Sequence, residues 1–295
     1  MTNYQGAIIE TPPTAARYLS YTIKPDADPR STIASLQAFI DPDQIVVGFG
    51  QSLINILNEN VPGLTDFPVI SGDGFDVPST PAALWCWLCA DDHGELITRT
   101  HKLEKILAPA FKRIELTEAF RYKEGRDLSG YIDGTENPEG ETAFDVAFVK
   151  GAGKDMDGSS FVAVQKWAHN LTHLKSMPQA EQDNIIGRRL SDNEEIEDAP
   201  LSAHVKRTAQ ESFSPEAFLL RRSMPWSERQ REGLMFVAFG CSTDAFATQL
   251  HRMCGKDDGI SDAIFRFTRP VSGAYYWCPP VENGKLNLMQ IGIHA

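Results

Sequence analysis

Apolar and polar positions change their period several times along the first 125 residues. Residues 16–24 are rich in aromatic and β-branched side chains, a composition typical of a strand. After a break at 25–29, Ser31 caps a segment whose apolar residues recur at helical spacing. The pattern predicts strand, helix, strand, strand, helix and strand, with a long loop at 62–81; these six elements cover 16–24, 31–40, 45–50, 84–90, 95–107 and 111–122.

A similar order returns after residue 160, with strands at 161–168, 218–221 and 234–240, helices at 179–190 and 243–253, and a closing segment at 263–276. The letters of 45–50 (Ile-Val-Val-Gly-Phe-Gly) also parallel those of 235–240 (Met-Phe-Val-Ala-Phe-Gly). A split βαβ arrangement used twice would explain both halves. We therefore expect an α+β protein in which two ferredoxin-like units form an antiparallel sheet core with peripheral helices. The units would be residues 1–125 and 161–295, and the junction at 126–160 would lie where ligands often bind.

Length and charge restrict the class of partner. The chain has 295 residues and a formal net charge of -12. This length allows a core large enough to hold a cofactor. The acidic balance argues against nucleic acid and against an anionic membrane, because both select for basic patches.

The cysteines and the amino terminus suggest a compartment. Five cysteines in a chain of this size argue against a disulfide framework and favour a reducing compartment. Cys86 and Cys89 have the spacing of a redox motif, but they fall inside a predicted strand and are expected to be core residues. No stretch approaches the ~20 apolar residues that span a membrane, and residues 1–10 do not resemble a secretion signal. We expect a cytoplasmic protein.

The loop Gly130-Tyr131-Ile132-Asp133-Gly134-Thr135-Glu136-Asn137-Pro138 is the first candidate for chemistry. Glycine lets a backbone approach a ligand closely, so one carboxylate in this loop would be held against a bound group. The alternative is that Asp-Gly is a hairpin turn and Asn-Pro closes an ordinary loop.

Histidines and arginines provide further candidates. His169 and His173 stand at helical i, i+4 spacing, but Asn170 occupies the position of the glutamate in a zinc-protease helix, so we expect polar surface or supporting groups. The segment 218–226 delivers Arg221 and Arg222 from a strand into a turn. If the strand alternates, one of them points inward and needs a carboxylate or an anionic ligand.

Taken together, these segments resemble the dye-decolourising peroxidase family of haem enzymes. The loop matches the Gly-x-x-Asp-Gly signature of that family and its Thr-Glu-Asn-Pro continuation. The segment around His204, the Arg-x-Ser turn at 221–223 and the run 262–268 match as well, in the same order. The resemblance covers nearly the whole chain, and it implies two ferredoxin-like units with haem b in the second.

The resemblance also implies a role for individual residues. His204 would be the proximal iron ligand, and Asp262 would accept its other ring N–H and raise the basicity of the imidazole. Asp133 and Arg221 would face the distal side, where hydrogen peroxide binds, together with Ser223 at a position where relatives carry asparagine or serine. Contacts to the porphyrin edge are implied for Glu136 and Asn137, and a contact to a propionate for either Arg188 or Arg207.

The residue types suit this chemistry. A carboxylate can take a proton from one peroxide oxygen and return it to the other, and a guanidinium stabilises the charge that develops on the leaving oxygen. Small-molecule donors such as dyes or phenolics would supply electrons, and oligomers, a dimer or larger, are common in the family. Two alternatives stay open: a haem-handling or haem-storage protein that uses the same pocket without turnover, and a regulatory module without haem.

Overall fold

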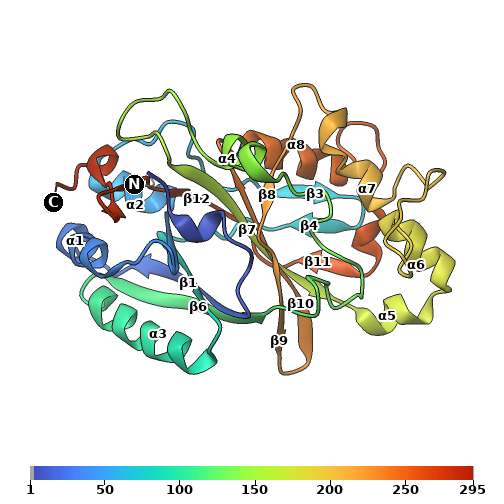
Figure 1. The fold of residues 1–295 in the computed structure, drawn as a ribbon, viewed down its shortest axis with the longest axis horizontal. Helices are drawn as coiled ribbons and strands as arrows, with labels where there is room; N and C mark the ends of the chain where they lie inside the picture. Colours follow the sequence, from blue (N-terminus) through green and yellow to red (C-terminus); the bar gives the residue numbers. More distant parts are fainter. Residues whose placement is uncertain (1–2, 295) are drawn as a thin grey trace.

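One antiparallel sheet organises the computed structural model, which describes residues 3–294 (Figure 1). Its ten strands follow the order β11-β7-β12-β2-β5-β1-β6-β9-β10-β8, and β7 pairs in addition with β10. This extra pairing closes the sheet on itself. The strands are β1 (Ala15–Ile23), β2 (Ile45–Phe49), β5 (Leu84–Ala90), β6 (Phe111–Phe120), β7 (Ser160–His169), β8 (Leu220–Arg221), β9 (Met224–Glu228), β10 (Arg231–Gly240), β11 (Thr268–Pro270) and β12 (Ala274–Cys278).

The sheet has two halves that meet at narrow seams. The first half has the order β2-β5-β1-β6, and the second contains β12-β7-β10-β9. At one seam the paired positions are Phe49 and Trp277, and at the other they are Ala119 and Trp226. Each seam is therefore only one paired position wide.

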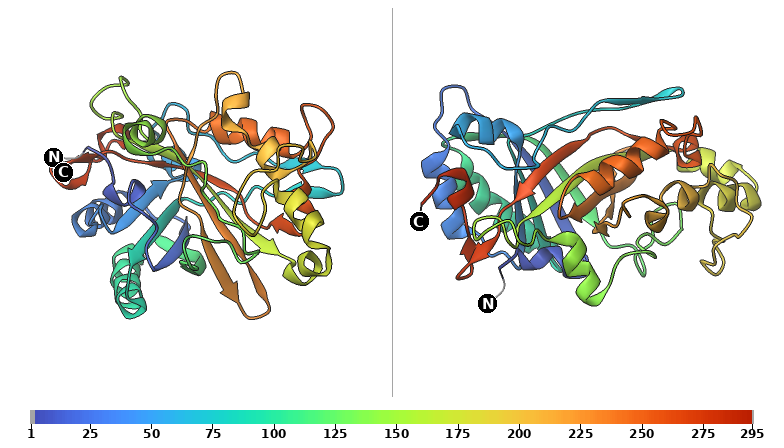
Figure 2. Two further views of the ribbon diagram at one scale, coloured as in Figure 1. Left: turned by 45° about the vertical axis from the view of Figure 1, so that its right-hand side comes forward. Right: turned by 90° about the horizontal axis from the view of Figure 1, so that it is seen from above.

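Helices gather at the two ends of this sheet. Figures 1 and 2 show α1 (Arg30–Phe39) and α3 (His93–Leu107) beside the first half, and α5 to α8 at the other end. The remaining helices are α2 (Gln51–Leu57), α4 (Gly140–Ala147), α5 (Leu171–Ser176), α6 (Gln179–Ile186), α7 (His204–Arg207) and α8 (Asp244–Met253). Short hairpins β3–β4 (Ile70–Gly72, Phe75–Val77) and β13–β14 (Val281–Glu282, Lys285–Leu286) and four 3-10 turns (Gly6–Ile8, Gln210–Ser212, Ala263–Arg266, Met289–Ile291) complete the described chain.

Strand β5 shows how the sequence builds the core. Side chains alternate along a strand, so Leu84, Cys86 and Leu88 join one apolar cluster while Trp85 and Trp87 join another. Cys89 packs against the second cluster. The two cysteines of the redox-like spacing thus lie on opposite faces, as expected, and all five cysteines are free thiols.

Two expected elements need correction, and one strand was not expected. The segment 62–81 is not entirely loop, because Phe75 stacks on Phe265 with ring centroids 3.7 Å apart and the β3–β4 hairpin forms there. The helix predicted at 179–190 ends at Ile186, where Gly187 takes a positive φ of 92°. The pattern did not predict β9, because a proline such as Pro225 discourages a strand assignment. In the structure Pro225 lies in this short strand, which has a single residue pair with β6.

The repeated letters of 45–50 and 235–240 do not mark equivalent strands. They fall on β2, which lies at the end of the order in the first half, and on β10, which lies inside the order of the second half. The sequence echo is therefore no argument for duplication.

Candidate active site

His204 begins the short helix α7, which follows a turn closed by a hydrogen bond from Ala203 N to Pro200 O. Its Nδ1 lies 2.8 Å from Oδ2 of Asp262, whose side chain is completely buried. The other oxygen of Asp262 accepts the backbone N–H of Ile264 at 2.9 Å and caps a 3-10 turn. A carboxylate accepts hydrogen bonds, so Nδ1 is the donor in this contact, and Nε2 is the ring nitrogen that can bind a metal ion.

Asp133 is held by the backbone of its own loop. Its N–H donates to Gly125 O at 3.1 Å, and Arg126 and Ile132 form an isolated antiparallel bridge. Gly134, which follows, has a φ of 82°. Among residues 3–294 the carboxylate of Asp133 has no hydrogen-bond partner, so it can receive one from a bound molecule.

Arg221 ends the two-residue strand β8, which pairs with β10 through Ala238 and Phe239. Within the described chain its Nε is buried without a hydrogen-bond partner. A buried guanidinium N–H without an acceptor is costly, and this favours a ligand that supplies one. The neighbouring Arg222 is buried too, but it bonds the carbonyls of Ile8 and Ile9 in place of the expected carboxylate or anionic ligand.

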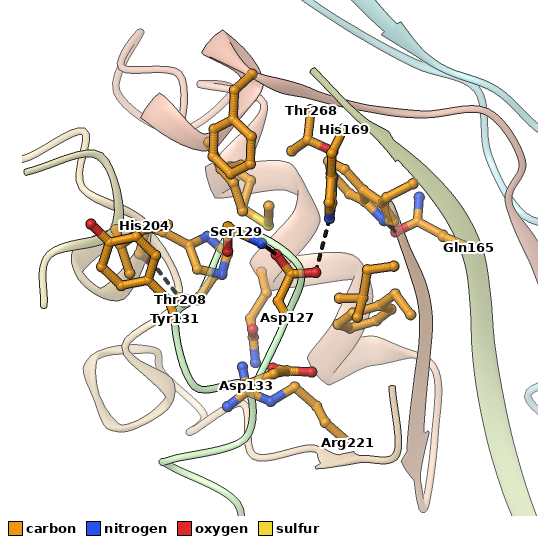
Figure 3. A pocket seen from close by; sticks show the side chains of 18 of the residues that line it. Asp127, Ser129, Tyr131, Asp133, Gln165, His169, His204, Thr208, Arg221 and Thr268 are labelled. Carbon is orange, nitrogen blue, oxygen red and sulfur yellow. Dashed lines mark hydrogen bonds and ion pairs between the residues drawn. The ribbon is translucent and has the colours of Figure 1, made fainter. Parts of the chain in front are cut away.

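One cavity brings His204, Asp133 and Arg221 together (Figure 3). In this view His204 lies apart from the Asp133–Arg221 pair, and each comes from a different segment of the chain. Two adjoining hollows share Asp133 and Arg221, and one of them also shares His204. Most of the wall is apolar, contributed by Ile132, Trp167, Ile186, Leu234, Phe236, Phe246, Leu250, Met253, Ile264 and Phe267.

Glu136 and Arg188 line the hollow next to His204. They form an ion pair with a separation of 2.5 Å, and Arg188 also bonds Asn193 O and Glu195. The side chain of Arg188 is largely buried, whereas that of Glu136 is exposed. A guanidinium, paired with Glu136 and Glu195, thus lies at this end of the site.

The other candidates lie outside the cavity wall. Arg207 makes two hydrogen bonds to Asp258, at 2.7 and 2.8 Å, and one to Arg252 O, so its charge is already neutralised. Asn137 and Ser223 line the second hollow, with Asp133 and Arg221.

A polar group in the cavity was not expected from the sequence. His169 ends β7 while His173 lies in α5, so the helical spacing of the two is coincidental. The His169 ring bonds Asp127 through Nε2 at 3.0 Å and Thr268 through Nδ1 at 2.6 Å, and all three line the cavity. Burial alone would raise the pKa of Asp127, but the hydrogen bonds from His169 and Ser129 hold it below its usual value. The only sequence signal for this pair is the polar residue at the end of an apolar strand.

Tyr131, like His204 and His169, is a cavity residue with a carboxylate partner. Its hydroxyl donates to Asp183 at 2.5 Å, and Gln179 bonds both groups. Burial and the adjacent carboxylate raise the pKa of this phenol. Tyr131 therefore stays protonated at neutral pH and fixes α6 to the loop that carries Asp133.

No grouping of three or more metal-binding side chains occurs within residues 3–294. Nor does that part of the chain contain a helix long and apolar enough to cross a membrane.

Comparisons with known proteins identify the family of this chain. Residues 124–283 match the family model described as Dyp-type peroxidase, C-terminal. A dye-decolorizing peroxidase of Rhodococcus erythropolis is 31% identical over 245 residues, which cover 80% of this chain and 72% of that protein.

Solved structures extend the likeness over the whole chain. A dye-decolorizing protein from V. cholerae has 28% identity and a TM-score of 0.86, covering 98% of this chain and 99% of that one. A variant of DypB from Rhodococcus jostii RHA1, described in complex with heme, has 25% identity and a TM-score of 0.84, covering 92% of this chain and 95% of that one. From its sequence and its fold alike, the chain belongs to the dye-decolourising peroxidase family and is a peroxidase.

Proposed function

We propose that the chain is a haem b peroxidase that uses His204 as the iron ligand and Asp133 with Arg221 to activate hydrogen peroxide. The observation that carries this proposal is the cavity that joins three features of the described chain: an imidazole oriented by Asp262, an unpaired carboxylate and a guanidinium with an orphaned N–H. The similar DypB variant in complex with heme supports the choice of cofactor.

The residues present fit a tetrapyrrole better than a bare metal ion. A single imidazole is one protein ligand, which suffices only when the cofactor itself brings the others. The wide apolar wall suits a flat hydrophobic ring, and the Asp262–His204 pair is the arrangement that raises imidazole basicity. We assign Arg188 to a propionate because it lines the hollow that also contains His204, whereas Arg207 does not line that hollow and pairs with Asp258.

When bound, haem would supply the redox-active iron at which the oxygen–oxygen bond of peroxide is cleaved. The chain would contribute proton transfer and charge. Asp133 would take a proton from one peroxide oxygen and return it to the leaving oxygen. The Arg221 guanidinium would stabilise the negative charge on that leaving oxygen.

Finer features of this function are also proposals. Electrons would come one at a time from dyes, phenolics or similar small donors. The strand orders of the two halves are those expected for two ferredoxin-like units, with boundaries near residues 125 and 160. Ser223 lines only the adjoining hollow that contains Asn137, so any part it takes in peroxide activation would be from there. An assembly of two or more copies is proposed from the family alone.

Stopped-flow spectra of the haem-loaded protein mixed with hydrogen peroxide test the assignment. Asp133→Asn and Arg221→Ala are each expected to slow the first spectral change about 100-fold or more while leaving the haem bound. His204→Ala should lose haem or change its Soret band, whereas the control His173→Ala, at an exposed position of α5, should change neither.

The same measurement separates peroxidase from haem carrier. If both distal variants react with peroxide as fast as the wild type, the two residues have no catalytic role. If the wild type binds haem but oxidises no phenolic or azo donor, a haem-handling protein is the better description.

A further inference from the structure

The side chain of Asn137 forms a clamp on the backbone of Arg221. Its Oδ1 accepts the Arg221 N–H at 2.8 Å, and its Nδ2 donates to the Arg221 C=O at 3.1 Å. The same carbonyl also accepts from Nη1 of Arg222 at 3.1 Å. Strand β8 is the last strand of the sheet order, so one primary amide occupies the place where a further strand would pair.

The clamp is tied to Asp133 by a tight turn. The Asn137 N–H donates to Gly134 O at 3.0 Å, and Gly134 directly follows Asp133. A Cβ at Gly134 would lie only 2.8 Å from Nδ2 of Asn137, so a side chain there would displace the amide from its position. One turn and the two hydrogen bonds of the Asn137 amide therefore connect the backbone at Asp133 with the backbone at Arg221.

A second amide reinforces the connection. Gln210 is buried; its Nε2 donates to Glu136 O at 2.9 Å and its Oε1 accepts the Leu219 N–H at 2.8 Å. Loop residues 136 and 137 are thus joined to residues 219 and 221 twice. This arrangement differs from the porphyrin-edge contact that the sequence suggested for Asn137.

We infer that Asn137 is a positioning residue that fixes Arg221 relative to Asp133. The inference rests on the proposed function, in which both side chains act on one peroxide molecule. Catalysis by two groups on so small a substrate depends on their separation, and a displacement of about 1 Å can cost about 100-fold in rate. Asn137 itself would touch neither peroxide nor haem, and its effect would pass entirely through Arg221.

A double-mutant cycle on the haem-loaded protein tests this. Asn137→Ala is expected to slow the reaction with hydrogen peroxide at least about 10-fold. In an Arg221→Ala background the same substitution should change the rate by less than about twofold, because the guanidinium that Asn137 positions is no longer present. The affinity of the ferric protein for cyanide, measured from its absorbance, should follow the same non-additive pattern without turnover.

Two further variants keep the test decisive. Asn137→Asp retains the acceptor for the Arg221 N–H but replaces the donor to the Arg221 C=O with a charged oxygen. It should therefore react with hydrogen peroxide more slowly than the wild type, and it supplies the test if the alanine variant does not fold. Asn287→Ala is the matched control: that buried amide also makes two hydrogen bonds, to Met289 N and Asp155, beside β14. It should lower stability and leave the peroxide rate unchanged.

The outcomes separate the inference from the proposed function. The positioning role is overturned if the rate loss in the double variant equals the product of the losses in Asn137→Ala and Arg221→Ala. It is also overturned if both Asn137 variants react at the wild-type rate. Either result leaves the peroxidase assignment intact. A wild-type rate in Arg221→Ala would overturn the catalytic role of Arg221 and the clamp with it.

Discussion

The sequence predicts the contacts of some residues of this site but not of others. His204 and Asp262 stand 58 positions apart, yet the family motifs place both, and the hydrogen bond between them is present. The sequence could not decide the role of Arg207. Its partner, Asp258, is distant in sequence, and no local pattern predicts the ion pair between them. The sequence singled out His169 as a polar surface or supporting group but did not place it in the cavity. Its spacing to His173 suggests a shared helix, whereas β7 ends and α5 begins between them.

A substitution at Asp262 tests the support of the imidazole. Asp262→Asn keeps the size of the side chain but weakens the acceptor for the His204 Nδ1–H. We expect haem affinity to fall about 10- to 100-fold, as for other residues that orient a metal-binding histidine. Titration of the purified protein with haem, followed by absorbance, measures the change. Asp257→Asn, at a surface carboxylate paired with Arg252, is the control, and an equal loss in both variants would contradict the role of Asp262.

At the scale of helices and strands, periodicity placed most elements and failed where tertiary contacts decide. The strands β1, β2, β5, β6 and β7 lie within one or two residues of their expected positions. The β3–β4 hairpin and β9 were absent from the expectation, since a glycine-rich loop and a proline argue against strands locally. The stacking of Phe75 on Phe265, which stabilises the first of these, cannot be read from either segment alone.

Helix α3 offers a test of local stability. The Asp92 side chain accepts the backbone N–H of Glu95 at 2.9 Å and so caps the helix. Asp92→Ala should lower the free energy of unfolding by about 1 kcal/mol, and Asp92→Ser should restore most of it, because serine also caps. Urea unfolding followed by circular dichroism gives both values. Equal losses in the two variants would show that the cap is not the cause.

For the whole molecule, the sequence predicted the mixture of helices and antiparallel sheet but not how the strands join, and the two ferredoxin-like units stay a prediction. The two halves of the sheet are joined by one residue pair at each seam, Phe49 with Trp277 and Ala119 with Trp226. Apolar periodicity indicates that these strands are buried but does not identify their partners. The same limit applies to the clamp on Arg221, in which Asn137 acts across 84 positions.

Acid stability is a property of the whole chain that the carboxylates determine. Hydrogen bonds from Arg207 and from the Ile260 N–H lower the pKa of Asp258 to about 2. The pKa values of Asp127 and Glu118 are lowered as well, by His169 and Arg17 in spite of burial. A carboxylate with a lowered folded-state pKa stabilises the protein above its unfolded pKa of about 4, and that contribution disappears as the pH falls towards the folded value.

We therefore expect the free energy of unfolding to decrease between about pH 4 and pH 2. Urea unfolding at pH 6, 4 and 3 measures the decrease, and Asp258→Asn should make it smaller because that group no longer titrates. An unchanged pH dependence in this variant would exclude Asp258 as a contributor.

Every residue that lines the His204 cavity lies between Asp127 and Thr268, whereas β1, β2, β5 and β6 all end before residue 121. Substitutions on the outer surface of the first half of the sheet therefore change no residue that lines that cavity. For protein engineering, α1 and the outer face of α3 are suitable places to attach an immobilisation tag or a fused domain. Libraries aimed at new electron donors belong in the second half.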